Sequence, residues 1–284
     1  FICVIVSENQ KRRGRTERMK KEDAVLVVSF GTSYNDSRKK TIEAIEKTIA
    51  GHFHDYEFHR AFTSRVIIQI LEKRDSIAVD GVSEAMERLF NQGIKRVLIS
   101  ATPVTSGEEF DAMMEEMRPY EAAFEAVAVG APLLTSEADY ERLVRILAED
   151  TKEFDAEGTE IILMGHGTEH SANEVYVRLA EEFKKQGYSR YHVGTVEAVP
   201  SLEDMKREVD RTGAHRVVLQ PLMIVAGDHA NNDMAGDEEG SWKSVFQSAG
   251  YDVVCRLKGL GELEGIRESF LEHAKMAVRS LTLK

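Results

Sequence analysis

The chain contains very little cysteine. Cys3 and Cys255 are the two cysteines among its 284 residues, which is too few for a disulfide framework or a cysteine-rich zinc site. We therefore expect a reducing, cytoplasmic setting. Any metal site in this protein would have to be built from histidine and carboxylate side chains.

Long apolar runs and basic surface stripes are also missing. No segment reaches the 18 uninterrupted apolar residues of a membrane-spanning helix. The formal net charge is −12, so a nucleic acid would be repelled by most of the surface. We therefore expect neither a membrane nor a nucleic acid to be the partner.

The sequence lacks the common nucleotide and nucleophile motifs. The first apolar run ends in "SFGTS", which has one glycine and no lysine, so neither GxGxxG nor GxxxxGK[ST] is present there. The later "GHG" does not match the GxSxG turn of serine hydrolases. We therefore expect no nucleotide and no organic cofactor.

The first residues of the chain stand apart from the rest. Residues 1–18 place a short apolar stretch before a basic run, the reverse of a secretory signal. Met19 then precedes "KKEDAVLVVSFG", which has the pattern of a natural start followed by a strand. We expect residues 1–18 to be a disordered or artefactual extension.

From Asp23 onward, compact apolar runs alternate with amphipathic stretches. The stretch from Asn35 to Gly51 predicts one helix, with Ile42, Ile45 and Ile49 on a single face. Strands separated by helices indicate an α/β protein with parallel sheets and helices on both faces. The predicted strands are 24–30, 56–62, 96–101, 124–130, 160–164, 191–197, 216–223 and 251–255.

The chain also repeats itself. Residues 25–33 (VLVVSFGTS) align with residues 161–169 (IILMGHGTE), and residues 93–114 align with residues 213–234 in the same order. Duplication of a βα unit explains both matches. We therefore predict two similar doubly wound parallel-sheet domains that face a central cleft, over residues 19–155 and 156–284. The last helical pattern, 261–280, is expected to pack back on the first half.

Three polar side chains follow predicted strands of the second half. His166, Glu197 and His229 come at the ends of strands 160–164, 191–197 and 216–223. Ligands of open α/β sheets lie at the carboxyl ends of the strands, so we expect these three to converge. Two imidazoles and one carboxylate can bind cobalt, nickel, iron or zinc, or share proton transfer.

Each of these residues also has an ordinary explanation. His166 fits a solvated turn residue. Glu197 fits a carboxylate stabilised by a helix N-terminus, and for this residue considered by itself that explanation is favoured over a functional one. His170 has the spacing to support His166 from four residues away. His229 fits a loop histidine bonded by its neighbours, which could equally orient it as a ligand: Asp228, Asn231 or Asn232.

The repeat distinguishes the two halves. The first half has Phe30 where the second has His166, and Glu109 where the second has His229. This asymmetry suits a flat, partly apolar ligand held over one set of metal-type groups. The glycines around His166 would then clear space for such a ligand to approach the ring.

Four stretches resemble one known family. "VLVVSFGTSY", "GHGTEHSANEVY", "VE-x-x-PSLEDM" and "PLMIVAGDHANNDMAGDEEGSWK" resemble the anaerobic cobaltochelatases of vitamin B12 synthesis, the CbiK-type class II chelatases. The resemblance begins near Lys20 and implies the chelatase-like fold of two similar domains. It implies that His166 and His229 are the active-site histidines and that Glu197 contacts the metal. Ala198 and Val199 depart from the glycine and aromatic residue expected there.

The resemblance also implies an activity. The expected reaction is ATP-independent insertion of Co²⁺, the metal substrate, into sirohydrochlorin during anaerobic cobalamin biosynthesis, with a neutral histidine accepting a pyrrole proton. The alternatives are a sirohydrochlorin ferrochelatase for sirohaem and a non-catalytic metal or tetrapyrrole carrier. A homo-oligomer is compatible with the sequence. The expected substrate contacts are Phe30, Thr32, Ser33, Arg65 and Glu109.

Overall fold

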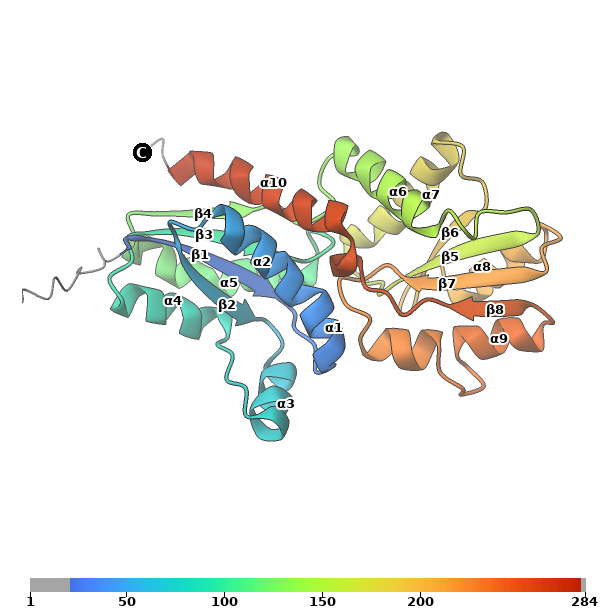
Figure 1. Ribbon diagram of the computed structural model, residues 1–284, viewed down its shortest axis with the longest axis horizontal. Helices are drawn as coiled ribbons and strands as arrows, with labels where there is room; N and C mark the ends of the chain where they lie inside the picture. Colours follow the sequence, from blue (N-terminus) through green and yellow to red (C-terminus); the bar gives the residue numbers. More distant parts are fainter. Residues whose placement is uncertain (1–20, 282–284) are drawn as a thin grey trace, which may run out of the picture.

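The computed structural model describes residues 21–281, and the predicted extension 1–18 lies outside them. Two parallel four-stranded sheets lie side by side (Figure 1). The first has the order β2-β1-β3-β4 and consists of β1 (Asp23–Ser29), β2 (Glu57–Phe62), β3 (Arg96–Ala101) and β4 (Ala126–Gly130). The second has the order β6-β5-β7-β8 and consists of β5 (Thr159–Gly165), β6 (Tyr191–Thr195), β7 (Arg216–Pro221) and β8 (Asp252–Cys255).

The two strand orders are the same when each half is counted from its own first strand. All eight predicted strands are confirmed, with ends that differ by at most two residues. We call the chain up to Asp155 the first half and the remainder the second half. The division into two domains at this point stays a prediction.

The strands are apolar because helices cover both faces of each sheet. In β1, Val25 and Val27 pack into the core on one face, and Leu26 and Val28 pack into the core on the other. This alternation with both faces buried is typical of parallel sheets. The connecting elements of the first half are α1 (Asn35–Lys40), α2 (Ile42–His52), α3 (Arg65–Asp75), α4 (Val82–Asn91), α5 (Glu108–Met117) and the 3₁₀ helix η1 (Arg118–Ala123).

The second half has fewer connecting α-helices among the described residues. Trp242 and Phe246 of α9 and Met205 of α8 pack on one face of its sheet, and α7 packs beside β6 on the other. The elements are the 3₁₀ helix η2 (Ser171–Asn173), α7 (Glu174–Lys185), α8 (Leu202–Val209), the π-helix η3 (Ala230–Met234), α9 (Trp242–Ser248) and the 3₁₀ helix η4 (Leu260–Glu262).

The single helix predicted over 35–51 is wrong. The structure divides it into α1 and α2 at Thr41, whose φ of −113° and ψ of −82° are not helical. Gly261 of η4 packs so closely that a Cβ built on it would lie 2.9 Å from the Cα of Thr41. The break therefore coincides with a close contact between segments far apart in sequence, which the helical periodicity could not reveal.

Two further helices are exchanged between the halves. α6 (Glu137–Thr151) follows β4 but packs beside α7, and its Thr151 hydroxyl lies 2.7 Å from the Tyr191 hydroxyl of β6. α10 (Glu264–Leu281) follows the second sheet but packs on β3, β4 and α2, as expected for 261–280. Figure 1 shows α10 crossing over the first sheet while α6 lies with α7.

The carboxyl ends of both sheets meet at the junction between the halves. The arrowheads of β1 and β7 point toward this junction from opposite sides (Figure 1). Polar contacts between loops at these ends include the Tyr34 hydroxyl, which donates to Asp228 Oδ1 at 3.3 Å, and His170 Nε2, which lies 3.6 Å from Asp111 Oδ2. Within residues 21–281, no helix combines the length and apolar character needed to cross a membrane.

Candidate metal centre

The turn after β5 presents His166. Gly165 ends the strand, and a Cβ there would lie 2.2 Å from the ring of Tyr176. Gly167 has a φ of +87°, and a Cβ there would lie 2.8 Å from the Ala198 backbone nitrogen. The prediction that these glycines clear space for a ligand is therefore wrong, because neighbouring protein atoms occupy that space. Their absent side chains instead allow the turn to form.

Glu197 lies in the bend after β6. The strand ends at Thr195, two residues earlier than predicted, and the Glu197 amide donates to the His166 carbonyl at 2.9 Å. Glu197 does not serve as the carboxylate of the helix N-terminus. Ser201 caps α8 and pairs with Asp204 in a capping box, so the ordinary explanation offered for Glu197 is wrong.

His229 lies between β7 and the π-helix η3. Its Nδ1 is 2.8 Å from Asp233 Oδ2. The neighbours expected to bond this ring make other contacts: Asp228 accepts from Tyr34 and Asn232, and Asn231 donates to the Ala226 and Gly227 carbonyls. The orienting partner is thus Asp233, and its four-residue spacing from His229 is the signal that could have identified it.

The three predicted residues come together. One ligand atom from each of His166, Glu197 and His229 lies within 4.8 Å of the other two. His166 Nδ1 is 3.7 Å from Glu197 Oε2, and the two imidazole rings meet edge to face with centroids 4.7 Å apart. The side chains are 47%, 53% and 31% exposed, respectively. Such an open set of two imidazoles and a carboxylate can take up and release a divalent transition metal.

His170 does not join this cluster, contrary to the expectation that it supports His166. Its Nδ1 accepts from the Ala172 amide at 3.0 Å. Its Nε2 faces Asp111 of the first half. His170 therefore stabilises η2 and contacts the opposite half of the molecule.

The first half supplies an apolar and a carboxyl group at the corresponding positions. Phe30 follows β1 and is 53% exposed. Glu109 lies in the first turn of α5, where burial raises its pKa to about 7, against the lowering effect of a hydrogen bond from Thr63 at 3.4 Å. A carboxyl group with this pKa can accept a proton near neutral pH.

The remaining predicted substrate contacts have partners within the protein. Arg65 begins α3 and pairs with Glu84 at 2.6 Å and Glu116 at 3.0 Å. Thr32 is buried, and its hydroxyl accepts from the Tyr34 amide at 3.2 Å. The carbonyl of Ser33 accepts from the Arg74 guanidinium. Their role as substrate contacts stays a prediction.

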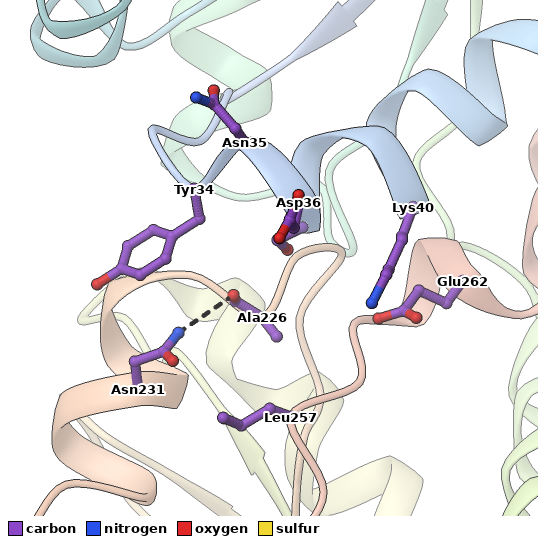
Figure 2. A pocket seen from close by; sticks show the side chains of 9 residues that line it. Tyr34, Asn35, Asp36, Lys40, Ala226, Asn231, Leu257 and Glu262 are labelled. Atoms are coloured by element: carbon purple, nitrogen blue, oxygen red, sulfur yellow. Dashed lines mark hydrogen bonds between the residues drawn. The ribbon is translucent and has the colours of Figure 1, made fainter. Parts of the chain in front are cut away.

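A pocket of about 350 Å³ lies where α1 meets the loop that carries His229. Figure 2 shows Asn231 reaching back to the Ala226 carbonyl, and Lys40 and Glu262 pointing toward one another. None of the three clustered ligands lines it. The pocket joins the two halves beside the candidate centre, with groups of both charges on its walls.

The fold and the cluster define a class: a two-sheet α/β protein with an exposed cluster of two histidines and a carboxylate, able to hold a metal ion, near the junction of its halves. The model of the family described as cobalt chelatase (CbiK) matches residues 23–279. The chain therefore belongs to the CbiK family of cobalt chelatases.

Two relatives with curated names align along nearly the whole chain. The sirohydrochlorin cobaltochelatase of Salmonella typhimurium is 38% identical over 258 residues, which cover 90% of this chain and 96% of the relative. The sirohydrochlorin cobaltochelatase CbiKC of Nitratidesulfovibrio vulgaris is 30% identical over 263 residues, which cover 90% and 91%, respectively.

Solved structures share the fold at low sequence identity. SirB from Bacillus subtilis with Fe³⁺ has a TM-score of 0.66 at 12% identity and covers 92% of this chain and 98% of SirB. CbiX, the terminal enzyme of siroheme biosynthesis in denitrifying bacteria, has a TM-score of 0.56 at 18% identity and covers 89% and 99%. These likenesses confirm the predicted arrangement of two similar α/β units.

Proposed function

We propose that this protein is a sirohydrochlorin cobaltochelatase that inserts Co²⁺ into sirohydrochlorin without ATP, in anaerobic cobalamin biosynthesis. The observation that carries the proposal is the convergence of His166, Glu197 and His229 within 4.8 Å in a chain of the cobalt chelatase family. The names of the two aligned relatives support the same substrates.

Co²⁺ is the metal substrate and is held by the two imidazoles and the carboxylate. This borderline donor set suits Co²⁺ and leaves positions open on the exposed side of the cluster. An exposed site with three protein ligands can pass its ion on, whereas a closed four-ligand site retains it. The second half thus acts as the metal donor in the proposed reaction.

Insertion releases two protons from the ring nitrogens for each Co²⁺ that enters. The free nitrogen of a neutral histidine can accept one of them. Glu109, whose pKa burial raises to about 7, is a second acceptor, contributed by the first half. The reaction then balances as one dication bound and two protons released, with no nucleotide among the proposed reactants.

The first half provides the surface on which we place the macrocycle. Phe30 occupies the turn position that His166 holds in the second half and exposes its ring. A flat tetrapyrrole seated against Phe30 would present one face to the metal cluster. We propose further contacts to its carboxylates from Thr32, Ser33 and Arg65, with Arg65 released from Glu84 and Glu116 when substrate binds.

The proposed setting is the cytoplasm, which agrees with a chain that has two cysteines and a free thiol at Cys255. The proposal includes no nucleic acid partner and no organic cofactor. A homo-oligomer is compatible with it, and sedimentation would measure the oligomeric state.

The test follows metal insertion into sirohydrochlorin by the change in its visible spectrum. Purified protein is compared with buffer alone, using Co²⁺, Fe²⁺ and Ni²⁺ in turn under anaerobic conditions. His166→Ala and His229→Ala are expected to lose insertion. His54→Ala, which removes an exposed histidine far from the cluster in sequence, is the matched control.

The outcomes separate the proposed activity from its alternatives. A rate with Fe²⁺ well above that with Co²⁺ would replace the cobaltochelatase with a ferrochelatase. Tight binding of metal and tetrapyrrole without acceleration over buffer would make the protein a carrier. Full activity in both cluster variants would show that the ligands have been assigned wrongly.

A further inference from the structure

Asp233 stands out among the residues around the candidate centre because its carboxylate lies 2.8 Å from His229 Nδ1. An ionised carboxylate only accepts hydrogen bonds, so the proton of a neutral His229 resides on Nδ1. The lone pair then belongs to Nε2, which is left to bind a metal. This is the arrangement by which outer carboxylates orient metal-binding histidines.

The local backbone holds this pair in place. Ala230 and Met234, which directly follow His229 and Asp233 in the chain and begin and end η3, are fully buried. The π-type hydrogen bond from the Ala235 amide to the Ala230 carbonyl, at 3.2 Å, spans the same segment. Single π-turns of this kind occur frequently at functional sites. The His229–Asp233 pair therefore sits on a segment anchored in the core, although both side chains are accessible.

The repeat supplies an independent observation. Glu109 and Met113 occupy the positions that His229 and Asp233 hold in the second half. Met113 is buried in the first core and has no hydrogen bond to offer a ring. The histidine and the carboxylate four residues later therefore occur together, in the half that carries the other two clustered ligands.

We propose that Asp233 is a positioning residue, which fixes the tautomer and the ring orientation of His229 so that Nε2 captures the incoming Co²⁺. This inference rests on the proposed function and adds a residue to its metal site. Asp233 acts through His229 and does not itself contact the ion. Its loss should weaken metal capture, while the three ligands remain in place.

The test titrates the metal-free protein with Co²⁺ and measures Kd and the visible d–d bands of the bound ion. Loss of an outer carboxylate typically costs about 10–100-fold in metal affinity, and we expect this loss for Asp233→Ala. Asp233→Glu is expected to recover part of the affinity. Asp237→Asn removes the same charge from an exposed position paired with Lys243, and it should change Kd less than about twofold on the scale expected for a surface charge.

The spectrum separates positioning from direct ligation and from a purely structural role. The d–d bands of Co²⁺-saturated Asp233→Ala should match those of the unmodified protein, whereas His229→Ala should shift them. A shift in Asp233→Ala would overturn the inference in favour of a direct ligand, and an unchanged Kd would overturn it outright. If Asp233→Ala unfolds, as circular dichroism would show, Asp233→Asn and Asp233→Glu carry the test.

Failure of this inference differs from failure of the proposed function. If the unmodified protein neither binds Co²⁺ nor inserts it, the proposed function is wrong. If it does both, and the Asp233 variants match it in Kd and in insertion rate, only the positioning role is wrong.

Discussion

The same turn follows the first strand of each sheet, but it carries Phe30 in the first half and His166 in the second. Its glycine has a φ of +96° at Gly31 and +87° at Gly167. The next loop repeats as well, because the amides of Ser64 and Glu197 donate to the carbonyls of Phe30 and His166, at 3.2 and 2.9 Å.

This comparison separates the backbone features that the two halves share from the side chains in which they differ. Backbone geometry and glycine positions agree between the halves, whereas the presented side chains differ at every ligand position. The corresponding residues, first half before second, are Phe30 and His166, Ser64 and Glu197, and Glu109 and His229. The second half thus offers the two imidazoles and the carboxylate that we propose bind the metal, and the first half offers an apolar ring, a hydroxyl and a partly buried carboxyl.

The largest effect should come from removing the side chains that differ most. We expect His166→Ala to reduce the Co²⁺ insertion rate by at least about 10³-fold, because it removes a ligand and a potential proton acceptor.

Phe30→Ala should raise KM about tenfold with a smaller change in kcat, since it removes apolar contact area. Steady-state kinetics measure kcat and KM for both variants. Equal effects of the two substitutions on kcat would contradict the assignment of metal binding to the second half and of macrocycle contact to the first.

The next effect concerns Glu109, the counterpart of His229. We expect Glu109→Gln to reduce kcat about 10²-fold and to remove a rise in rate between pH 6 and 8, because only the ionised carboxylate accepts a proton and its pKa is about 7. A pH–rate profile of both proteins measures this.

The same substitution, Glu109→Gln, should lower activity but raise stability. The folded pKa of Glu109 lies above its ordinary value of 4.5, so ionisation opposes folding, and the penalty is complete above pH 7. Glu109→Gln should therefore raise the free energy of unfolding at pH 8 by an amount on the order of 2 kcal/mol, and not at pH 4. A variant that is no more stable at pH 8 would contradict the burial argument.

A third prediction tests the part that the halves share. Gly31→Ala and Gly167→Ala should each reduce the free energy of unfolding by about 2–4 kcal/mol, because φ is positive and a Cβ would meet Phe62 at 2.6 Å or Ala198 at 2.8 Å. Gly187 has a φ of +89° but open space around it. Gly187→Ala is therefore the control and should cost about 1 kcal/mol. Denaturant unfolding measures all three, and a cost for Gly167→Ala no larger than the control would show that its turn is not confined.

The smallest effect concerns the contact between the two exchanged helices. His273 of α10 lies 3.1 Å from Asp139 of α6. Burial alone would raise the pKa of Asp139, but hydrogen bonds from Ser136, Thr135 and His273 lower it below its ordinary value. This depressed pKa stabilises the fold above about pH 4, and the contribution is lost as the pH falls through the folded pKa.

Asp139→Asn should therefore be less stable than the unmodified protein at pH 6, by about 1 kcal/mol, with the difference shrinking toward pH 3. Thermal melting across this range measures it. The exposed Asp55→Asn is the control, and a difference for Asp139→Asn that does not change with pH would contradict the prediction.

The sheets and the three clustered residues can be predicted from the sequence because both depend on short-range patterns. Apolar runs identify the strands, and the rule that ligands lie at the carboxyl ends of parallel strands brings His166, Glu197 and His229 together.

The features that the sequence does not reveal depend on contacts between distant segments. Gly261 against Thr41, Tyr176 against Gly165 and the partners of Arg65 all require knowing which surfaces meet. Asp233 is a different case, because its spacing from His229 is visible in the sequence. Three other polar neighbours compete with it there, and only the folded backbone shows which of the four faces the ring.

The exchange of α6 and α10 bears on how such a molecule could arise. In a single four-stranded unit whose last helix packs on another molecule, as α6 packs on the second half, one face of its own sheet would be uncovered. Two such units that exchange their last helices would cover each other's sheets, which is the arrangement of a domain-swapped dimer. When the two copies are joined in one chain, the exchanged helices stay in place. The side chains of each copy can then change independently while the two copies remain associated.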